Sequence, residues 1–364
     1  MAFRIQRKKI HHIVPRLPPA VDGVGDYALS LARQLRHDYD IDTHFIVGDP
    51  AWPDIEQIEE FKTTKLATRS TQALLDRLTP SNPVLLHYVG YGYAKRGCPT
   101  WLIQALEIWK QQNQQVHLVT MFHEIAASGP MWTSAFWLSG LQRNLAKRLV
   151  NVSDRLLTSK QLYAEILQGY GKGRFNEIPS LPVFSNVGEP ENPPDLSKRD
   201  RHLVIFGGRS KRAGVYQSSL DQLKQICSYL DIEQIIDIGP KLDAIPTHIG
   251  DVPITATGSL PSDEVSGLLS KAIAGFFNYS PPFLGKSGIF AAYCAHRMLP
   301  VSAQMTSHIE DGLYPGQHYL LPDQYSAGAK DGLVLQAIAD KSHAWYQSHN
   351  LANHVKVYQE LLFI

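Results

Sequence analysis

Short apolar runs alternate along this chain with longer stretches whose apolar residues recur at helical spacing. The run Lys9–Val14 is followed by a loop and then by Tyr27–Leu35, where leucine and alanine recur on one face of a helix. Strands that alternate with helices are typical of parallel sheets covered on both faces, so the pattern predicts an α/β fold. The segments predicted to be strands are Lys9–Val14, Thr43–Val47, Pro83–Tyr88, Val116–Phe122 and Arg155–Ser159, and then Leu203–Phe206, Ile235–Ile238, Ile254–Thr257, Ala272–Phe277 and Leu299–Ser302.

One stretch interrupts this alternation. Ser185–Asp200 is rich in proline and charge and lacks apolar periodicity, which predicts a linker. A chain of 364 residues is also longer than one hydrophobic core usually serves. We therefore predict two doubly wound domains, residues 1–190 and 200–340, with a cleft between them. The end of the chain, 341–364, predicts a long helix over His343–Phe363 that either belongs to the second domain or crosses back to the first.

Charge and cysteine content narrow the functional classes. The 35 basic and 34 acidic residues leave a net charge of +1, which does not support a strongly basic nucleic-acid-binding surface, so we expect no nucleic-acid partner. Cys98, Cys227 and Cys294 are too widely spaced for a disulfide framework or a metal site. No apolar stretch reaches the length of a spanning helix or of a secretion signal. We therefore expect a cytoplasmic protein without a bound metal.

One segment combines aromatic and basic residues. Met131–Leu138 is rich in tryptophan and phenylalanine, and Arg143, Lys147 and Arg148 follow it. A helix of this kind either packs its aromatic face on its own sheet or lies on an anionic membrane surface. The second alternative leaves open a peripheral contact with the cytoplasmic face of a membrane.

Two glycine-rich turns each join a predicted strand to a predicted helix in the second half of the chain. Glycine lets the backbone approach a phosphate, a helix N-terminus offers free N–H groups, and arginine or lysine neutralises the charge. Because both turns leave the carboxyl ends of strands in one sheet, they predict a bound diphosphate. The residues expected to bind it are Gly208, Arg209, Lys211 and Arg212 in the first turn and Gly285, Lys286, Ser287 and Gly288 in the second.

Polar residues at strand ends are the candidates in the first half of the chain. His123 and Glu124 follow the strand Val116–Phe122, where ligands of open α/β sheets bind. Local hydrogen bonds within a loop would explain the same pair without a ligand. The side chains of His11 and His12 lie next to each other on the first strand and must point to opposite faces, so we expect one to be packed and neither to bind a ligand.

The loop after the first strand contains Gly23, Gly25 and Asp26 and has the flexibility to approach a ligand. Asp26 would serve equally well as the N-cap of the following helix. The chain has neither the ligand spacing of a metal site nor a complete P-loop. Gly285-Lys-Ser is similar to the tail of a P-loop, but Ser280 stands where its first glycine belongs, which argues against ATPase chemistry.

Together these motifs resemble those of the GT-B-fold, retaining glycosyltransferases of family four, and the similarity covers most of the chain. Gly23-Val-Gly25 resembles the N-terminal glycine loop of that family, and Thr120–His123 resembles its strand that ends in a sugar-contacting histidine. Phe206–Arg209 is similar to its strand-Gly-Arg turn, and Gly285–Gly288 is similar to the loop that caps the diphosphate. The resemblance implies two Rossmann-like domains with an interdomain cleft.

The resemblance also implies a function. A retaining enzyme of this type moves a hexose, with UDP-glucose as the first choice of donor, to a saccharide or lipid-linked acceptor in bacterial surface polysaccharide synthesis. It needs no metal or other cofactor. Arg209 and Lys286 would stabilise the leaving diphosphate, His123 would position the sugar, and Glu124 would assist. The loop with Gly23, Gly25 and Asp26 would face the acceptor.

The chain departs from the family in two places. Arg209, Lys211 and Arg212 are crowded, whereas the family spaces its arginine and lysine by several residues. Phe290–Ala292 stands where the family has a glutamate that holds the nucleotide ribose. Two other functions therefore remain open, namely a nucleotide-sugar 2-epimerase or hydrolase on the same fold and a non-catalytic nucleotide-sugar-binding protein.

Overall fold

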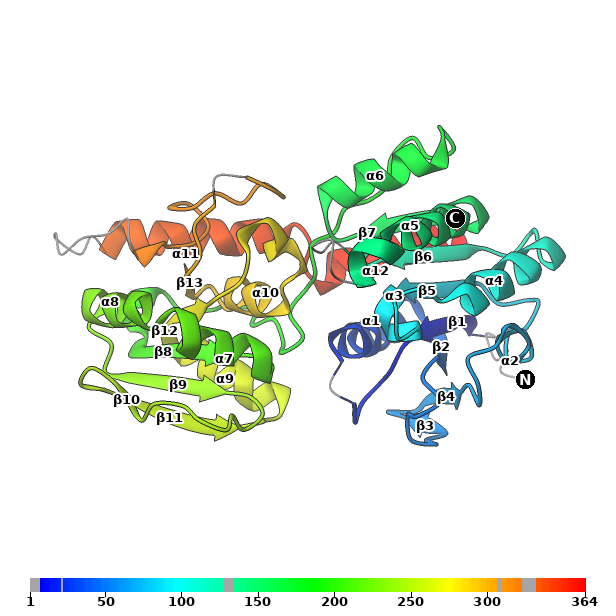
Figure 1. Ribbon diagram of the computed structural model, residues 1–364. Coiled ribbons are helices and arrows are strands. Elements are labelled where there is room, and N and C mark those ends of the chain that lie inside the picture. Colours follow the sequence, from blue (N-terminus) through cyan, green and yellow to red (C-terminus); the bar gives the residue numbers. More distant parts are fainter. Residues whose placement is uncertain (1–6, 21, 128–133, 307–308, 323–331) are drawn as a thin grey trace, which may run out of the picture. The chain divides into compact units, whose positions relative to one another are not determined.

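Two α/β units, each built around its own sheet, make up the protein (Figure 1). The structure is a computed structural model that describes residues 7–20, 22–127, 134–306, 309–322 and 332–364. Unit 1 comprises Met1–Leu181 and Leu351–Ile364, and unit 2 comprises Pro182–Asn350. The α/β fold with two domains, predicted from the alternation of strands and helices, is confirmed.

Unit 1 contains a sheet whose strands are β1 (Lys8–Val14), β2 (Ile41–Val47), β3 (Gln57–Ile58), β4 (Phe61–Lys65), β5 (Val84–Tyr88), β6 (Leu118–Phe122) and β7 (Arg155–Thr158). Its helices are α1 (Gly23–Tyr39), α2 (Thr71–Leu75), α3 (Gly90–Tyr93), α4 (Thr100–Gln112), α5 (Ser134–Val152), α6 (Gln161–Gly171) and α12 (Leu351–Phe363). The strand order is β3-β4-β2-β1-β5-β6-β7, and the pairs are parallel except for β3 with β4.

The hairpin of β3 and β4 lies at the edge of this sheet and was not predicted. Its two-residue turn is formed by Glu59 and Glu60, whose φ angles of 49° and 66° are in the left-handed region. Turns of this kind are normally built from Asn, Asp or Gly, so two glutamates do not signal a hairpin. The strands are short and partly exposed, which removes the apolar signal as well.

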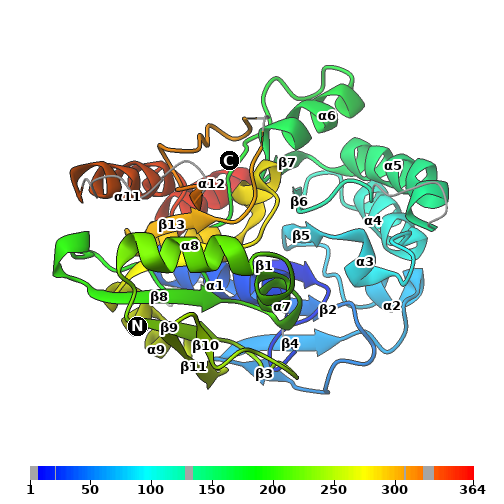
Figure 2. The same cartoon turned by 60° about the vertical axis from the view of Figure 1, so that its left-hand side comes forward.

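Unit 2 contains the strands β8 (Asp200–Phe206), β9 (Gln234–Ile238), β10 (His248–Ile249), β11 (Val252–Gly258), β12 (Ala272–Phe277) and β13 (Leu299–Ser302). Its helices are η1 (Leu196–Lys198), α7 (Arg209–Ser218), α8 (Leu220–Leu230), α9 (Ser262–Lys271), η2 (Pro281–Lys286), α10 (Gly288–Ala295) and α11 (Gly332–Gln347), where η denotes a 3₁₀-helix. The order is β10-β11-β9-β8-β12-β13, and α8 and α9 lie on opposite faces of this sheet (Figure 2).

The strand order of each sheet reverses at one place, which positions the candidate site. In unit 1 the chain builds outward from β1 through β2 and β4, and then returns to the other side of β1 with β5. In unit 2 the same reversal occurs between β8 and β12. Ligands of open α/β sheets bind outside the carboxyl ends of the strands at such a switch point.

The segment predicted to be a linker is instead an ordered part of unit 2. The Arg199 side chain is only 7% exposed and donates hydrogen bonds to the carbonyl oxygens of Leu269, Ala272 and His296. The backbone N–H of Leu196 donates to Gln336 Oε1 at 2.8 Å. These contacts hold a proline-rich segment in place without any apolar periodicity that a sequence reading could detect.

The end of the chain forms two helices and not the single helix predicted over His343–Phe363. A turn over 348–350 separates α11, which belongs to unit 2, from α12, which belongs to unit 1. The buried residues of α12 include Val355, Tyr358 and Leu362, and the helix packs against α1 (Figure 1). The Tyr358 hydroxyl lies 3.1 Å from that of Tyr27 on α1.

The aromatic stretch near the start of α5 lies partly outside the described residues, because the structure describes the chain again only from position 134. Phe136 and Trp137 are 41% and 75% exposed. In the part of the chain that the structure describes, no helix has the length and apolar character needed to cross a membrane.

We expect Tyr358→Ala to lower the free energy of unfolding of unit 1 by about 3–5 kcal/mol, because it opens a cavity under α12 and removes a partner of Tyr27. Lys356→Ala, at an exposed position of the same helix, should stay within about 0.5 kcal/mol of the parent protein. Urea unfolding followed by circular dichroism measures both. Equal stability of the two variants would show that α12 contributes little to unit 1.

Candidate active site

The two glycine-rich turns of unit 2 lie next to each other. Gly207 follows β8 with a φ of 130°, and Gly208 is the N-cap of α7. A Cβ atom at Gly207 would lie 2.5 Å from Cδ1 of Ile289, which is in the first turn of α10. Glycine is favoured at this position because other residues rarely adopt such a φ angle. The structure therefore brings together the two turns that the sequence predicts as one site.

Arg212, which we expected to bind phosphate, is instead committed to a buried ion pair. Its guanidinium and the carboxylate of Asp237 on β9 are 2% and 0% exposed, and Nη2 donates to Oδ1 at 2.6 Å. The Tyr216 hydroxyl donates to the other carboxylate oxygen at 2.8 Å. Arg212 Nη1 donates to the carbonyl oxygens of Gly207 and Pro240. Arg212 thus holds the turns that follow β8 and β9, and its charge is neutralised within the protein.

The other two cations of the first turn are at the surface. Arg209, the first residue of α7, is exposed and has no hydrogen-bond or ion-pair partner among the residues that the structure describes. Lys211 is also exposed, and its Nζ lies 4.2 Å from the centroid of the Tyr279 ring. Packing of this kind removes water, which lowers the pKa of Lys211. A small cavity at the ends of β8 and β12 is lined by Lys211, Asn278, Tyr279 and Ile289 among others.

Asn278, directly after β12, was not among the predicted site residues. Its amide nitrogen donates to the carbonyl oxygen of Gly214 and to the hydroxyls of Ser218 and Ser219, all within 3.2 Å. These bonds fasten α7 to the end of β12 and so help to fix the position of Arg209. The available signal was a polar residue immediately after a fully buried strand.

The second turn is a short 3₁₀-helix followed by Ser287, the N-cap of α10. The Ser287 hydroxyl accepts a hydrogen bond from Phe290 N at 3.2 Å, and its own N–H donates to Leu284 O at 2.9 Å. We expected this N–H to bind phosphate, but it is already used inside the turn. By helix geometry the first N–H groups of α10, at Gly288 and Ile289, lack an intrahelical acceptor.

The remaining residues of the second turn differ in exposure. Gly285 is buried, and its carbonyl oxygen accepts a hydrogen bond from Val183 N at 2.8 Å, so it shapes the turn. Lys286 is half-buried, and its Nζ lies 6.0 Å from the centroid of the Phe283 ring. Residues 290–292, where we noted that the expected ribose-binding glutamate is missing, are fully buried in the core, which explains their apolar character.

The loop after β1 in unit 1 leads into α1, and Asp22 is the N-cap of this helix. Its carboxylate accepts hydrogen bonds from Val24 N at 2.9 Å and Gly25 N at 3.2 Å. The alternative that Asp26 caps the helix is therefore wrong. Asp26 lies in the first turn, where burial and then the charge of Asp22 raise its pKa to about 6. A Cβ atom at Gly25 would lie 2.4 Å from the carbonyl oxygen of Arg16, whereas Gly23 is open to solvent and has free space around it.

His123 lies at the carboxyl end of β6 and is 7% exposed. Its backbone N–H donates to Tyr88 O at 3.0 Å, and its Nε2 lies 2.8 Å from Nδ1 of His87. The ring of Tyr27 on α1 meets the His123 ring edge-on, with 5.5 Å between the centroids. The structure thus brings His123 together with Tyr27 of α1, and Glu124 next to it is half-buried.

Both histidines of β1 are packed, although we expected only one to be. Their side chains are 1% and 0% exposed because β1 is a central strand with both faces covered. His11 Nε2 lies 2.7 Å from the Thr79 hydroxyl, whereas His12 stacks on His87 with ring centroids 4.7 Å apart. Burial, and then the charge of His123, lower the pKa of His12 to about 3.

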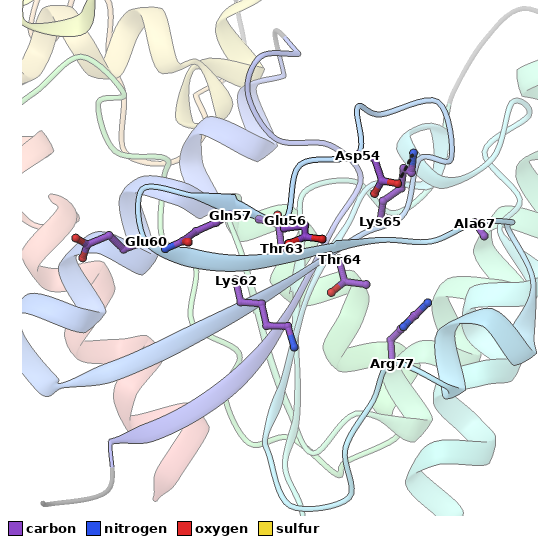
Figure 3. A pocket seen from close by; sticks show the side chains of 10 residues that line it. All are labelled: Asp54, Glu56, Gln57, Glu60, Lys62, Thr63, Thr64, Lys65, Ala67 and Arg77. Atoms are coloured by element: carbon purple, nitrogen blue, oxygen red, sulfur yellow. Dashed lines mark ion pairs between the residues drawn. The ribbon is translucent and has the colours of Figure 1, made fainter.

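Another hollow lies away from these residues. It measures about 710 Å³ and lies beside the edge strands β3 and β4 of unit 1 (Figure 3). Acidic side chains such as Glu56 and Glu60 and basic ones such as Lys62 and Arg77 line it together. It contains none of the predicted site residues, and we assign it no role. Within the described residues, no group of three His, Cys, Asp or Glu side chains is arranged to hold a metal ion.

Comparison with solved structures identifies the fold. TarM superimposes with a TM-score of 0.63 at 7% sequence identity, and 99% of each chain is covered. The pneumococcal O-GlcNAc transferase GtfA in complex with UDP and GlcNAc gives 0.57 at 11% identity, covering 98% of this chain and 100% of the other. The chain has the GT-B fold. No model of a protein family and no curated protein matches the sequence.

A third similar structure corrects one expectation. An α-glucosyltransferase bound to UDP and a 13-mer DNA with an HMU base gives a TM-score of 0.56 at 9% identity, covering 99% of this chain and 100% of the other. Two further structures of an α-glucosyltransferase also contain DNA. Our exclusion of a nucleic-acid partner was therefore wrong. It depended on the net charge of the whole chain, which does not report how charge is distributed over its surface.

We expect Arg212→Ala to lower the free energy of unfolding by about 3–5 kcal/mol, because it leaves the buried carboxylate of Asp237 without its partner. Arg209→Ala, three residues earlier at the surface, should leave stability within about 0.5 kcal/mol. Thermal and urea unfolding of the two variants make the comparison. A stable Arg212→Ala protein that no longer binds a nucleoside diphosphate would return Arg212 to the phosphate site.

The buried histidines of unit 1 predict a loss of stability in mild acid. His12 has a folded-state pKa of about 3, below the value of about 6.5 for an unfolded chain. As the pH falls below about 6.5, this histidine therefore takes up a proton in the unfolded chain but not in the folded one. Each such histidine lowers the free energy of unfolding by up to roughly 1.4 kcal/mol per pH unit. The stabilisation from a neutral His12 is fully present above that pH.

Urea unfolding at pH 7, 6 and 5 measures this effect. We expect His12→Leu to show a shallower dependence of the free energy of unfolding on pH than the parent protein. The matched control is the exposed His248, where substitution by leucine should leave the slope unchanged. Parallel slopes for all three proteins would mean that His12 is not buried in its neutral form.

Proposed function

We propose that this protein is a glycosyltransferase that moves a hexose from a nucleotide-diphosphate sugar to an acceptor hydroxyl with retention of the anomeric configuration. The observation that carries the proposal is the pair of turns at the switch point of unit 2. An exposed, unpaired Arg209 begins α7 there, and the start of α10 lies against Gly207. A doubly charged diphosphate is the ligand chemistry that such a pair of helix N-termini and an unpaired guanidinium favour.

The donor-side roles follow from the charge and position of the groups around these two turns. Arg209 can donate two parallel hydrogen bonds to phosphate oxygens, and Lys211 and Lys286 add positive charge nearby. The N–H groups of Gly288 and Ile289 and the dipole of α10 act on the same negative charge. Arg212 and Ser287 hold the two turns in place from within the protein and do not contact the donor.

On the donor side the transfer reaction requires little beyond these positive charges and N–H groups. When the bond between the anomeric carbon and the diphosphate breaks, negative charge accumulates on the leaving oxygen and positive character on the sugar. The cations of unit 2 stabilise that charge before the acceptor oxygen bonds to the same face of the sugar, and a diphosphate oxygen takes the acceptor proton. Loss of one preorganised donor of this kind costs about 10²–10³ in rate. We propose that these cations do the work that a metal ion does in metal-dependent transferases.

The unit 1 residues are proposed to bind the sugar and the acceptor. His123 would position the transferred sugar, and Glu124 would assist. Asp26, with its raised pKa, is suited to exchange a hydrogen bond with an acceptor hydroxyl as either donor or acceptor. We propose UDP-glucose as the first donor to test. Surface saccharides are the first class of acceptor, and the DNA complexes of similar structures make DNA with an HMU base the second.

A donor and acceptor screen tests the proposal. UDP-, GDP- and ADP-sugars are each incubated with the protein, with and without a saccharide panel and an HMU-containing duplex, in buffer with EDTA. We expect nucleoside diphosphate release that increases with acceptor and persists in EDTA. Free sugar at the full rate without any acceptor would indicate a hydrolase or epimerase. Tight donor binding without turnover would indicate a binding protein.

Arg209→Ala is expected to lower turnover by about 10²–10³ and to weaken nucleoside diphosphate binding, because it removes a cation from the phosphate. Lys224→Ala, an exposed lysine on α8, is the matched control and should behave like the parent protein. Calorimetric titration with UDP and the turnover assay give the two readouts. Unchanged UDP affinity in Arg209→Ala would place the diphosphate elsewhere.

A further inference from the structure

Three histidines on adjacent strands of unit 1 form a stack of imidazole rings. His12 on β1 and His87 on β5 have ring centroids 4.7 Å apart, and His87 and His123 have centroids 5.1 Å apart. His12 and His87 are completely buried, whereas His123 at the end of the stack is 7% exposed. The stack therefore connects the interior of the sheet to the one histidine that is proposed to contact the sugar.

His87 has one defined partner in this stack. Its Nδ1 lies 2.8 Å from Nε2 of His123, whereas its own Nε2 is buried and has no hydrogen-bond partner among the described residues. Burial, followed by the charges of His12 and His123, holds the pKa of His87 well below its ordinary value, so the ring is neutral. A neutral imidazole carries one N–H, on either nitrogen.

The environment of His87 selects between the two positions of this proton. A buried N–H without an acceptor is rarer in proteins than a buried acceptor without a donor. The proton of His87 therefore belongs on Nδ1, where it is donated to His123, and the bare Nε2 is the atom left without a partner. His123 Nε2 must then be the acceptor and carries no proton.

We propose that His87 is a positioning residue that sets the tautomer of His123, so that His123 carries its single proton on Nδ1 and keeps Nε2 bare. This inference rests on the proposed function for the role of His123, but the tautomer itself does not depend on it. His87 touches neither donor nor acceptor in this scheme and acts through His123 alone.

The surrounding aromatic rings hold the stack in place. Tyr27 meets the rings of both His87 and His123 edge-on, and Tyr358 of α12 lies parallel to His87 at 6.3 Å. The Tyr27 hydroxyl is itself fixed by His354 Nδ1 at 2.7 Å and by Tyr358. Rotation of His87 would break these contacts together, so its Nδ1 remains directed at His123.

Three variants test the proposal by kinetics. His87→Leu removes the donor, whereas the amide nitrogen of His87→Asn occupies nearly the place of imidazole Nδ1 and keeps one. His12→Leu is the matched control, because it removes a buried imidazole from the same stack and leaves the bond between His87 and His123 intact. We expect His87→Leu to lower kcat on the order of 10²-fold with unchanged UDP affinity, His87→Asn to recover most of that loss, and His12→Leu to remain near the parent value.

Nitrogen-15 NMR of the histidine side chains gives a readout that requires no turnover. The parent protein and His87→Asn should show His123 protonated on Nδ1 and bare on Nε2, with the signal assigned by its absence from His123→Gln. In His87→Leu the Nε2-protonated tautomer should appear. A parent spectrum with a proton on His123 Nε2 overturns the proposal, as does His87→Leu with full activity and an unchanged tautomer. If no sugar transfer is ever detected, the proposed function is wrong, and the NMR spectra still decide whether His87 sets the tautomer of His123. If His87→Leu does not fold, the parent and His87→Asn spectra still decide.

Discussion

The buried ion pair between Arg212 and Asp237 is the constraint on which the donor side depends. It lies at the carboxyl ends of β8 and β9 and engages both carboxylate oxygens, the Tyr216 hydroxyl and the carbonyl oxygen of Gly207. Because removal of either charge would leave the other unpaired in the interior, the turn after β8 cannot relax easily. One arginine of the turn is used to hold it, and this leaves Arg209 exposed at a fixed place.

Unit 1 holds its strand-end histidine with stacked rings and not with an ion pair. His12, His87 and His123 are held by stacking, by one hydrogen bond and by the ring of Tyr27. In both units the residue proposed to contact the donor lies at or just after a strand end, and its support lies deeper in the same sheet or on a neighbouring element. Residues placed on rigid elements and supported in this way are held more accurately than residues on free loops.

The main strands could be predicted because buried parallel strands are continuous apolar runs. The charges of the first turn could not be assigned to roles, because Arg212 is separated from Asp237 by 25 residues and from the sequence alone it looks no different from Arg209. The partnership of His87 with His123 likewise depends on strand order, since the two are 36 residues apart. The hairpin at Glu59 and Glu60 could not be predicted, because glutamate rarely adopts the left-handed backbone conformation that these two residues have.

The return of α12 to unit 1 has a consequence for biosynthesis. The core of unit 1 remains incomplete on the ribosome until the last helix emerges, after all of Pro182–Asn350 has been made. At about 5–20 residues per second this interval lasts roughly 10–30 s. During it Tyr27 lacks the side chains of His354 and Tyr358 that cover it in the finished protein. Unit 2, which is continuous in sequence, can fold first, so the order in which the two units mature is opposite to the order in which they begin.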